Sequence, residues 1–245
     1  MIASRLPRAS RAREARPYDG PDMTTPPTLP ADAAARVRSL VRRSGRVLLG
    51  LVGPPGAGKS TLAAALLAEF PRIAQVVPMD GFHLANVELQ RLGRADRKGA
   101  PDTFDADGYV ALLRRLLAQG DDEIVYAPEF RREIEEPVAG AIPVFPTTQL
   151  VITEGNYLLL EDGPWAQVTG LLDETWYVDI PDALRVERLT QRHVQFGRSA
   201  DAAAAWVEST DEPNARLIEA SRARASFVFR WNDPEVSPET DAGAP

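Results

Sequence analysis

The chain has 245 residues, of which 44% are hydrophobic and 26% charged, and it carries 28 Lys and Arg against 35 Asp and Glu, a formal net charge of −7. These proportions are typical of an ordinary globular protein, and the acidic balance does not favour a general nucleic-acid-binding function. Because the sequence contains no cysteine, it excludes disulfides, zinc–thiolate clusters and thiol nucleophiles.

The first 30 residues are predicted to be disordered. Arginine, proline and small residues dominate this segment, so it has few large apolar side chains to offset the entropy of ordering. An Arg-rich, acid-poor start also leaves a transit peptide open, but there is no secretory hydrophobic segment and Met23 offers an alternative start. We therefore favour disorder or upstream sequence over targeting.

Alternating apolar strands and helices follow, and they predict an α/β fold. A helical pattern runs from residue 31 to Gly45, the apolar run 46–52 suits a buried parallel strand, and a helix at 59–70 precedes a second strand at 73–78. The later elements in the sequence are an amphipathic helix at 107–119, strands at 150–153, 175–180 and 226–230, and a helix that starts at 182. Strands alternating with helices indicate a mostly parallel sheet covered on both faces.

We expect one domain over residues 31–232, with a flexible tail at 233–245. Residues 122–147 are rich in Pro, Val and Glu and read as extended segments outside the alternation. No run approaches the roughly 20 apolar residues that a membrane helix needs. The expected protein is therefore cytoplasmic, with neither a membrane nor a nucleic acid as partner.

A phosphate-binding loop is the strongest motif in the chain. Residues 53–60 match G-x-x-x-x-G-K-[ST] and lie between a buried strand and a helix, the context that the motif requires. Glycines allow the backbone N–H groups to surround a phosphate, and the following helix adds its positive N-terminal dipole. Lys59 would reach the β- and γ-phosphates of a nucleotide and Ser60 would bind Mg²⁺. The residues expected to bind the nucleotide here are Gly53, Pro54, Pro55, Gly56, Ala57, Gly58, Lys59, Ser60 and Thr61.

Two carboxylates follow predicted strands. Asp80 comes after the second strand, where an acceptor substrate would lie opposite the γ-phosphate, so it could take the proton of an attacking hydroxyl. The alternative is an Asx turn with Gly81. Glu154 follows the apolar strand at 150–153 in a Walker B arrangement, and it would hold Mg²⁺ near Ser60 directly or through water. Its alternative is a solvated glutamate at a strand end.

Three arginines share one face of the helix that begins at residue 182. Arg185, Arg188 and Arg192 stand at i, i+3 and i+7. A cluster of like charges is costly unless an anion lies against it, and a triphosphate would be that anion, with one arginine acting as an arginine finger. Solvated arginines on an exposed face are the alternative. Gly197 and the alanine-rich stretch after it suit a mobile lid.

Taken together, five segments resemble the uridine kinase, type I pantothenate kinase and phosphoribulokinase family of phosphate-loop kinases, in particular a nucleoside-kinase-like or fructose-transport-kinase-like bacterial branch. The segments are GPPGAGKST (53–61), PMDGFHL (78–84), RKGAPDTFD (97–105), ITEGNYLLL (152–160) and RVERLTQRH (185–193). The resemblance covers about residues 46–231 in unchanged order. The phosphate loop is generic, whereas the second and third segments are more specific to this family.

The resemblance implies a three-layer sandwich around a five-stranded parallel sheet, with a hairpin-like insertion at about 122–147 and a helical lid at about 185–210. It implies transfer of the γ-phosphoryl group of ATP, with Mg²⁺, to a hydroxyl of a nucleoside-, sugar- or pantothenate-like small molecule. Asp80 would be the general base, and Lys59, Arg188 and Arg192 would act on the transferring phosphate. The residues that would face the acceptor are His83, Lys98, Tyr126 and Asn214. Relatives often form dimers or tetramers, which leaves a homodimer open.

One departure from the family concerns the insertion. Phe130 is followed by Arg131 and Arg132, where relatives usually carry an aspartate. The two arginines either meet an acidic or phosphorylated acceptor or pair with Glu133, Glu135 and Glu136, and we prefer the second interpretation. The departure weakens both uridine and pantothenate as acceptors.

A different class of function remains as an alternative, a nucleotide-hydrolysing regulator that acts on a protein partner. A guanine-reading switch of this kind would need an N/T-K-x-D segment. Lys59 and Lys98 are the only two lysines, and neither lies in such a segment. The sequence therefore favours the kinase.

Overall fold

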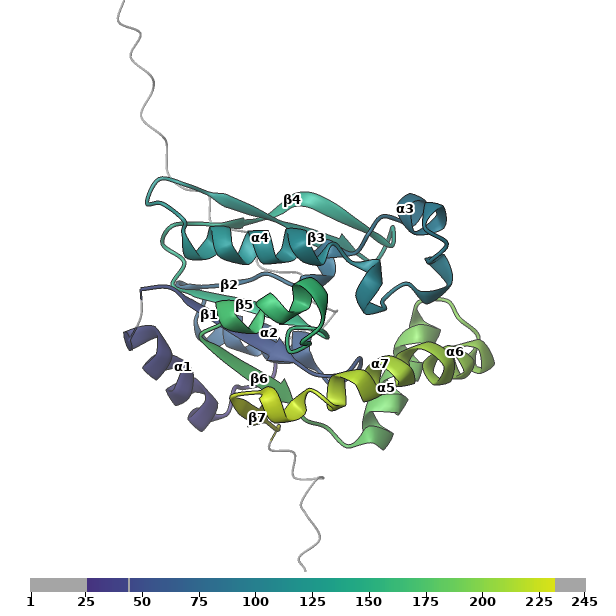
Figure 1. The fold of residues 1–245 in the computed structure, drawn as a ribbon. Helices are drawn as coiled ribbons and strands as arrows, with labels where there is room; N and C mark the ends of the chain where they lie inside the picture. Colours follow the sequence, from purple (N-terminus) through teal and green to yellow (C-terminus); the bar gives the residue numbers. More distant parts are fainter. Residues whose placement is uncertain (1–25, 44, 232–245) are drawn as a thin grey trace, which may run out of the picture.

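The computed structural model describes residues 26–43 and 45–231. The disorder expected for residues 1–25 and the flexible tail expected at 233–245 fall outside these ranges. Within them, the predicted parallel sheet is confirmed, with the strand order β2-β5-β1-β6-β7 (Figure 1). Its strands are β1 (Val47–Val52), β2 (Ala74–Val76), β5 (Leu150–Gly155), β6 (Glu174–Val178) and β7 (Phe227–Phe229). All four pairings between neighbouring strands are parallel.

The sheet divides the interior into two apolar cores. All six residues of β1 are buried, and they alternate between the faces, so Leu48 and Val52 contact one core while Leu49 and Leu51 contact the other. This two-sided burial explains why the strand is a nearly continuous apolar run in the sequence. Strand β2 is a short strand at the edge of the sheet, and the N–H of Val77 continues its pairing with β5 by donating to the Ile152 carbonyl oxygen at 2.8 Å.

Helices cover both faces of the sheet (Figure 1). The seven α-helices of the described ranges are α1 (Ala31–Arg43), α2 (Lys59–Glu69), α3 (Asn86–Arg91), α4 (Ala106–Leu117), α5 (Asp182–Gln195), α6 (Ala200–Trp206) and α7 (Glu212–Glu219). Buried side chains of α1 and α2 belong to one core and those of α4 to the other. A π-helical turn, Val207–Asp211, joins α6 to α7. In Figure 1, α3 and the α5–α6 pair lie on the same side of the molecule.

Residues 26–30 differ from the expectation of disorder through residue 30. Residues 26–30 have no regular secondary structure, yet Leu29 is only 7% exposed and packs into the core beneath α1. The carbonyl of Pro30 accepts a hydrogen bond from the Ala34 N–H at 3.0 Å. A single large apolar side chain is therefore enough to hold this segment against the domain.

The insertion expected near 122–147 is an antiparallel hairpin of β3 (Val125–Arg131) and β4 (Glu136–Val144). Its core-facing side chains pack with α4, and they are Val125, Ala127, Ile142 and Val144. The register shifts between Ala127 and Glu129, and Glu135 in the turn has a positive φ of 53°. These two irregularities set the direction of the side chains at the hairpin tip.

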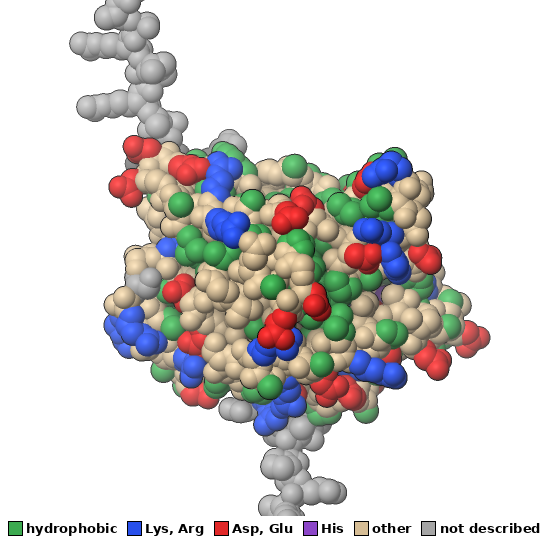
Figure 2. Space-filling view, viewed as in Figure 1, with side chains coloured by type: hydrophobic (Ala, Val, Ile, Leu, Met, Phe, Trp, Pro, Cys, Tyr) green, Lys and Arg blue, Asp and Glu red, His purple; other side chains and the backbone are tan. Residues whose placement is uncertain are grey.

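The described part of the chain contains no helix long and apolar enough to cross a membrane. On the face in Figure 2, acidic and basic side chains are interspersed with apolar ones.

Candidate functional site

The phosphate-binding loop joins the carboxyl end of β1 to the start of α2, as the motif predicts. Gly56 and Gly58 have φ values of 83° and 90°, a region that favours glycine. A Cβ on Gly56 would also lie 2.8 Å from the carbonyl oxygen of Arg185. Glycine at this position therefore serves the turn of the loop and its close contact with α5.

Lys59, the first residue of α2, is buried within the loop. Its Nζ donates hydrogen bonds to the carbonyl oxygens of Gly53 (2.8 Å) and Pro54 (3.1 Å) and to Oδ1 of Asn156 (2.8 Å). Burial lowers the pKa of Lys59 to about 8, against the opposing effect of the nearby carboxylates of Glu154 and Asp80. Asn156 stands two residues after Glu154 at the same strand end, and no motif in the sequence predicts its contact with Lys59.

Ser60 and Glu154, whose oxygens are predicted to bind Mg²⁺, lie in contact with each other. The Ser60 hydroxyl donates to Oε1 of Glu154 at 2.8 Å. Burial raises the pKa of Glu154, and the charge of Lys59 opposes that rise. Among the residues that the structure describes, no group of three or more His, Cys, Asp or Glu could hold a metal. A single hydroxyl–carboxylate pair fits Mg²⁺, which keeps several waters and binds substrate phosphates instead of needing an all-protein cage.

Asp80 lies in a 3₁₀ turn, Met79–Phe82, immediately after β2. The turn packs closely against the hairpin, since a Cβ on Gly81 would lie 2.4 Å from the carbonyl oxygen of Pro128. Glu154 ends the neighbouring strand β5, and the charge of Asp80 acts on both Lys59 and Glu154. The fold therefore brings the two predicted carboxylates together at one edge of the sheet.

His83 lies between two aromatic rings beside Asp80. Its ring centroid is 4.0 Å from that of Phe104 and 4.6 Å from that of Phe130. Its Nδ1 lies 2.8 Å from the Asp80 carbonyl oxygen, and since a carbonyl only accepts, Nδ1 is the donor. Burial lowers the pKa of His83, so the ring is neutral at pH 7 and Nε2 is left as an acceptor.

The three arginines of α5 have different surroundings, although they share one helix. Arg192 is half-buried, and the charges of Asp80 and Glu154 act on it. Arg188 is exposed and lines a cavity beyond β6 and β7.

Arg185 was expected to contact the nucleotide, but its side chain is buried beside acidic groups. Its side chain is 2% exposed, and its guanidinium pairs with Asp182 (3.1 Å) and Glu212 (2.5 Å). It therefore joins α5 to α7 from inside the fold.

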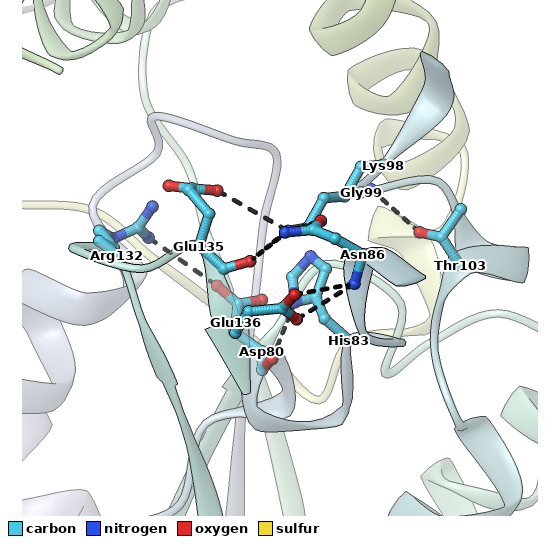
Figure 3. A network of polar contacts seen from close by, with 9 residues as sticks. All are labelled: Asp80, His83, Asn86, Lys98, Gly99, Thr103, Arg132, Glu135 and Glu136. Atoms are coloured by element: carbon cyan, nitrogen blue, oxygen red, sulfur yellow. Dashed lines mark hydrogen bonds and ion pairs between the residues drawn. The ribbon is translucent and has the colours of Figure 1, made fainter. Parts of the chain in front are cut away.

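The residues expected to face the acceptor do not all gather at Asp80. Tyr126 is 55% exposed, because the buried neighbours on either side of it in β3 point toward the core and direct it outward. Asn214 is half-buried on α7. Lys98 donates to Oδ1 of Asn86 (2.7 Å) and to the Glu135 carbonyl oxygen (2.5 Å), so it ties the hairpin turn to α3 (Figure 3).

The hairpin tip brings an arginine to the site. Arg132 lies with its Nη2 3.9 Å from Oδ2 of Asp80, and its charge acts on Lys59, Glu154 and Arg192. The preferred sequence interpretation, pairing with the hairpin glutamates, does not describe it. The signal in the sequence was that Arg131 and Arg132 follow Phe130 where relatives usually carry an aspartate.

The chain has a glycine-rich loop with a buried lysine, and the serine after that lysine contacts a glutamate on β5, the strand beside β1. These features define a phosphate-loop nucleotide-binding protein. Comparison with known proteins narrows this class. A Schizosaccharomyces pombe protein provisionally named a uridine kinase is 38% identical over 185 residues, or 72% of this chain and 78% of that protein. An ATP-dependent kinase-like protein from Aspergillus versicolor is 34% identical over 167 residues, or 65% of this chain and 97% of the other.

The crystal structure of a provisionally named fructose transport system kinase from Silicibacter sp. is 40% identical, with a TM-score of 0.72 over 80% of this chain and 98% of the other. No protein-family model matches the chain. The chain thus belongs to the uridine kinase, type I pantothenate kinase and phosphoribulokinase family of phosphate-loop kinases, and it is an ATP-dependent phosphotransferase.

Proposed function

We propose that this kinase transfers the γ-phosphoryl group of ATP, with Mg²⁺, to a hydroxyl of a nucleoside-, sugar- or pantothenate-like small molecule in the cytoplasm. One observation carries the proposal. The carboxylate of Asp80 is partly open to solvent, and its charge acts on Lys59 of the phosphate loop and on Arg192 of α5. A base beside phosphate-binding cations is what hydroxyl phosphorylation needs.

A cavity of about 340 Å³ between the start of α5 and the end of β7 supports the nucleotide part of the proposal. It lies at the carboxyl ends of β6 and β7, beside the strand that leads into the loop, where ligands of open α/β sheets bind. The cavity is lined by Asp179, Ile180, Pro181, Leu184, Arg188, Arg230 and Trp231. A purine ring there would have apolar walls and an indole, with Arg188 near the phosphates.

In the proposed reaction, Asp80 accepts the proton of the acceptor hydroxyl as its oxygen bonds to the γ-phosphorus. The bond between that phosphorus and the β–γ bridging oxygen breaks, and ADP leaves. Lys59 and Arg192 stabilise the charge on the transferring group, and Lys59 would exchange its neutral carbonyl partners for phosphate oxygens. Ser60 and Glu154 would hold Mg²⁺, which would supply further charge neutralisation on the phosphates.

The substitution Asp80→Asn tests the proposal. It keeps the shape of the side chain but removes the base, so kcat for phosphoryl transfer should fall by at least ~100-fold, the lower end for loss of general-base catalysis. ATP binding, measured by calorimetry, should persist. Asp96→Asn is the matched control, since Asp96 is exposed on the loop after α3. Unchanged turnover in the Asp80 variant would remove this residue from the mechanism.

The acceptor itself is found by screening nucleosides, sugars and pantothenate for stimulation of ATP consumption. If every hydroxyl compound leaves consumption at the level of background hydrolysis, the kinase proposal fails. A regulator acting on a protein partner would then account better for the nucleotide site.

A further inference from the structure

Arg132 approaches Asp80 but does not form a hydrogen bond with it. The separation of 3.9 Å between Nη2 and Oδ2 exceeds the range in which such a bond has useful strength. Arg132 is 44% exposed on its side chain, and within residues 26–43 and 45–231 it donates no hydrogen bond. Its five N–H donors are therefore open to a ligand at the hairpin tip (Figure 3).

Arg132 forms no ion pair with a hairpin glutamate among the described residues. Glu136 instead accepts two hydrogen bonds of 3.1 Å from the N–H of Asn86, and Oε2 of Glu135 lies on the side of Lys98, 3.9 Å from its Nζ. The neighbouring Arg131 pairs with Glu129 at 2.6 Å. The two adjacent arginines are thus not equivalent: one is bound on the hairpin surface and the other faces the site.

The charges around Asp80 explain why a guanidinium that donates no hydrogen bond at this place matters. The charge of Arg132 disfavours the charged forms of both Lys59 and Arg192, and the charge of Arg192 also disfavours that of Lys59. The carboxylates of Asp80 and Glu154 favour the charged forms of Lys59 and Arg192. Lys59 belongs to the phosphate loop and Arg192 to α5, so a nucleotide triphosphate accounts for both. Arg132 comes from the hairpin wall, on the side of the predicted base, where the acceptor would lie.

The hairpin tip is also held in place. Lys98 bonds to both Asn86 and the Glu135 carbonyl oxygen, and its Nζ lies 5.1 Å from the ring centroid of Phe130. These contacts fix the turn that follows Arg132 before any ligand arrives. A pre-positioned guanidinium can grip a planar or tetrahedral oxyanion with paired N–H donors at little further entropic cost.

We propose, building on the kinase function above, that the acceptor carries an oxyanion, as a phosphate monoester or a carboxylate, close to the hydroxyl that is phosphorylated, and that Arg132 binds this oxyanion. Neutral sugars and nucleosides are then poor acceptors, because they offer no oxyanion to the N–H donors of Arg132.

The test uses pairs of acceptors that differ only in charge. Fructose 6-phosphate against fructose and UMP against uridine form the phosphate arm, and pantothenate against pantothenol forms the carboxylate arm. Transfer from radiolabelled ATP is measured for each compound with the full-length protein. In at least one pair the anionic member should have a kcat/KM at least ~10-fold above its neutral partner, as expected when a charged hydrogen-bonding group finds its partner.

The variant Arg132→Gln should then raise KM for the preferred anionic acceptor by about 10- to 100-fold, the effect of losing charge-assisted hydrogen bonds. Its kcat should change little, and Arg132→Lys should recover part of the loss because it restores only the charge. Arg131→Gln is the matched control and should behave as the wild type, since Arg131 pairs with Glu129.

The outcomes separate the two proposals. If the neutral members are phosphorylated as well as the anionic ones, or if Arg132→Gln leaves the anionic preference intact, the oxyanion inference is overturned while the kinase function stands. If no member of any pair accepts phosphate from ATP, both proposals fail together. Selective loss of the anionic acceptor in Arg132→Gln alone supports the inference.

Discussion

Single residues of the site owe their properties to where the fold buries them. His83 is held between Phe104 and Phe130, and burial lowers its pKa. As the pH falls below about 6.5, the unfolded chain takes up a proton on this histidine before the folded chain does. The free energy of unfolding therefore decreases on acidification, and above that pH His83 contributes no pH dependence.

We expect His83→Asn to flatten this dependence. Asparagine retains an N–H donor for the Asp80 carbonyl but does not titrate, so its free energy of unfolding should fall less than that of the wild type between about pH 7 and about pH 5. Denaturant titrations of both proteins over this range provide the measurement. The charged groups that face His83 are Asp80, Lys98 and Arg132, and they are common to both proteins. Parallel curves would show that His83 titrates as it does in water.

At this scale the sequence predicts a residue well when a local motif fixes its position. The loop at 53–60 needed only its own glycines, its lysine and its flanking strand and helix. Arg132 could not be placed in this way, because it follows the register shift after Ala127 and lies in the hairpin turn, whose geometry the sequence does not show. Tyr126 is directed outward by the alternation along β3, since its two neighbours are buried.

At the scale of elements, the hairpin and the segment that contains α3 behave as one wall. Lys98 joins them through Asn86 and the Glu135 carbonyl. Figure 3 shows this network beside Asp80 and His83. The resemblance implies that Lys98 faces the acceptor, and this stays a prediction. In the structure its ammonium joins the two parts of the wall and its charge acts on His83.

The substitution Lys98→Gln tests the tether. Losing the two hydrogen bonds and the contact over Phe130 should speed amide hydrogen exchange in the hairpin turn by roughly 10-fold, the equivalent of about one or two ordinary hydrogen bonds. Exchange in β1, at the centre of the sheet, should not change. Arg131→Gln is again the control because it lies on the same hairpin without reaching α3. Equal protection of the turn in the Lys98 variant and the wild type would contradict the tether.

Elements were predictable where the sequence has a continuous apolar run or several turns of an amphipathic helical pattern. The strand at 46–52 and the helix at 107–119 appear within two residues of the expected bounds. Helix α3 has only six residues, too few for a helical period to stand out from chance. The π-helical turn between α6 and α7, Val207–Asp211, falls at the end of the segment predicted as a lid and interrupts the regular helical period there.

At the scale of the molecule, one sheet separates two cores that share every central strand. Leu48 and Trp165 belong to one core, and Leu49 and Trp176 to the other. Because adjacent residues of β1 serve opposite cores, neither core can be lost without disrupting the strand that carries the phosphate loop. The nucleotide site is therefore coupled to the stability of the whole domain, and local repacking on one face should be felt on the other.

Leu48→Ala and Leu49→Ala test this coupling from opposite faces. Each should reduce the free energy of unfolding by about 2–5 kcal/mol, the usual range for a buried leucine. The variants are made in two backgrounds, one retaining Trp165 and the other Trp176 as the only tryptophan, and unfolding is followed by fluorescence and far-UV circular dichroism. Since a single cooperative domain gives coincident transitions by every probe, both signals should shift together in all four proteins. If a substitution shifts the fluorescence transition only when the remaining tryptophan lies in the same core, the two faces unfold independently.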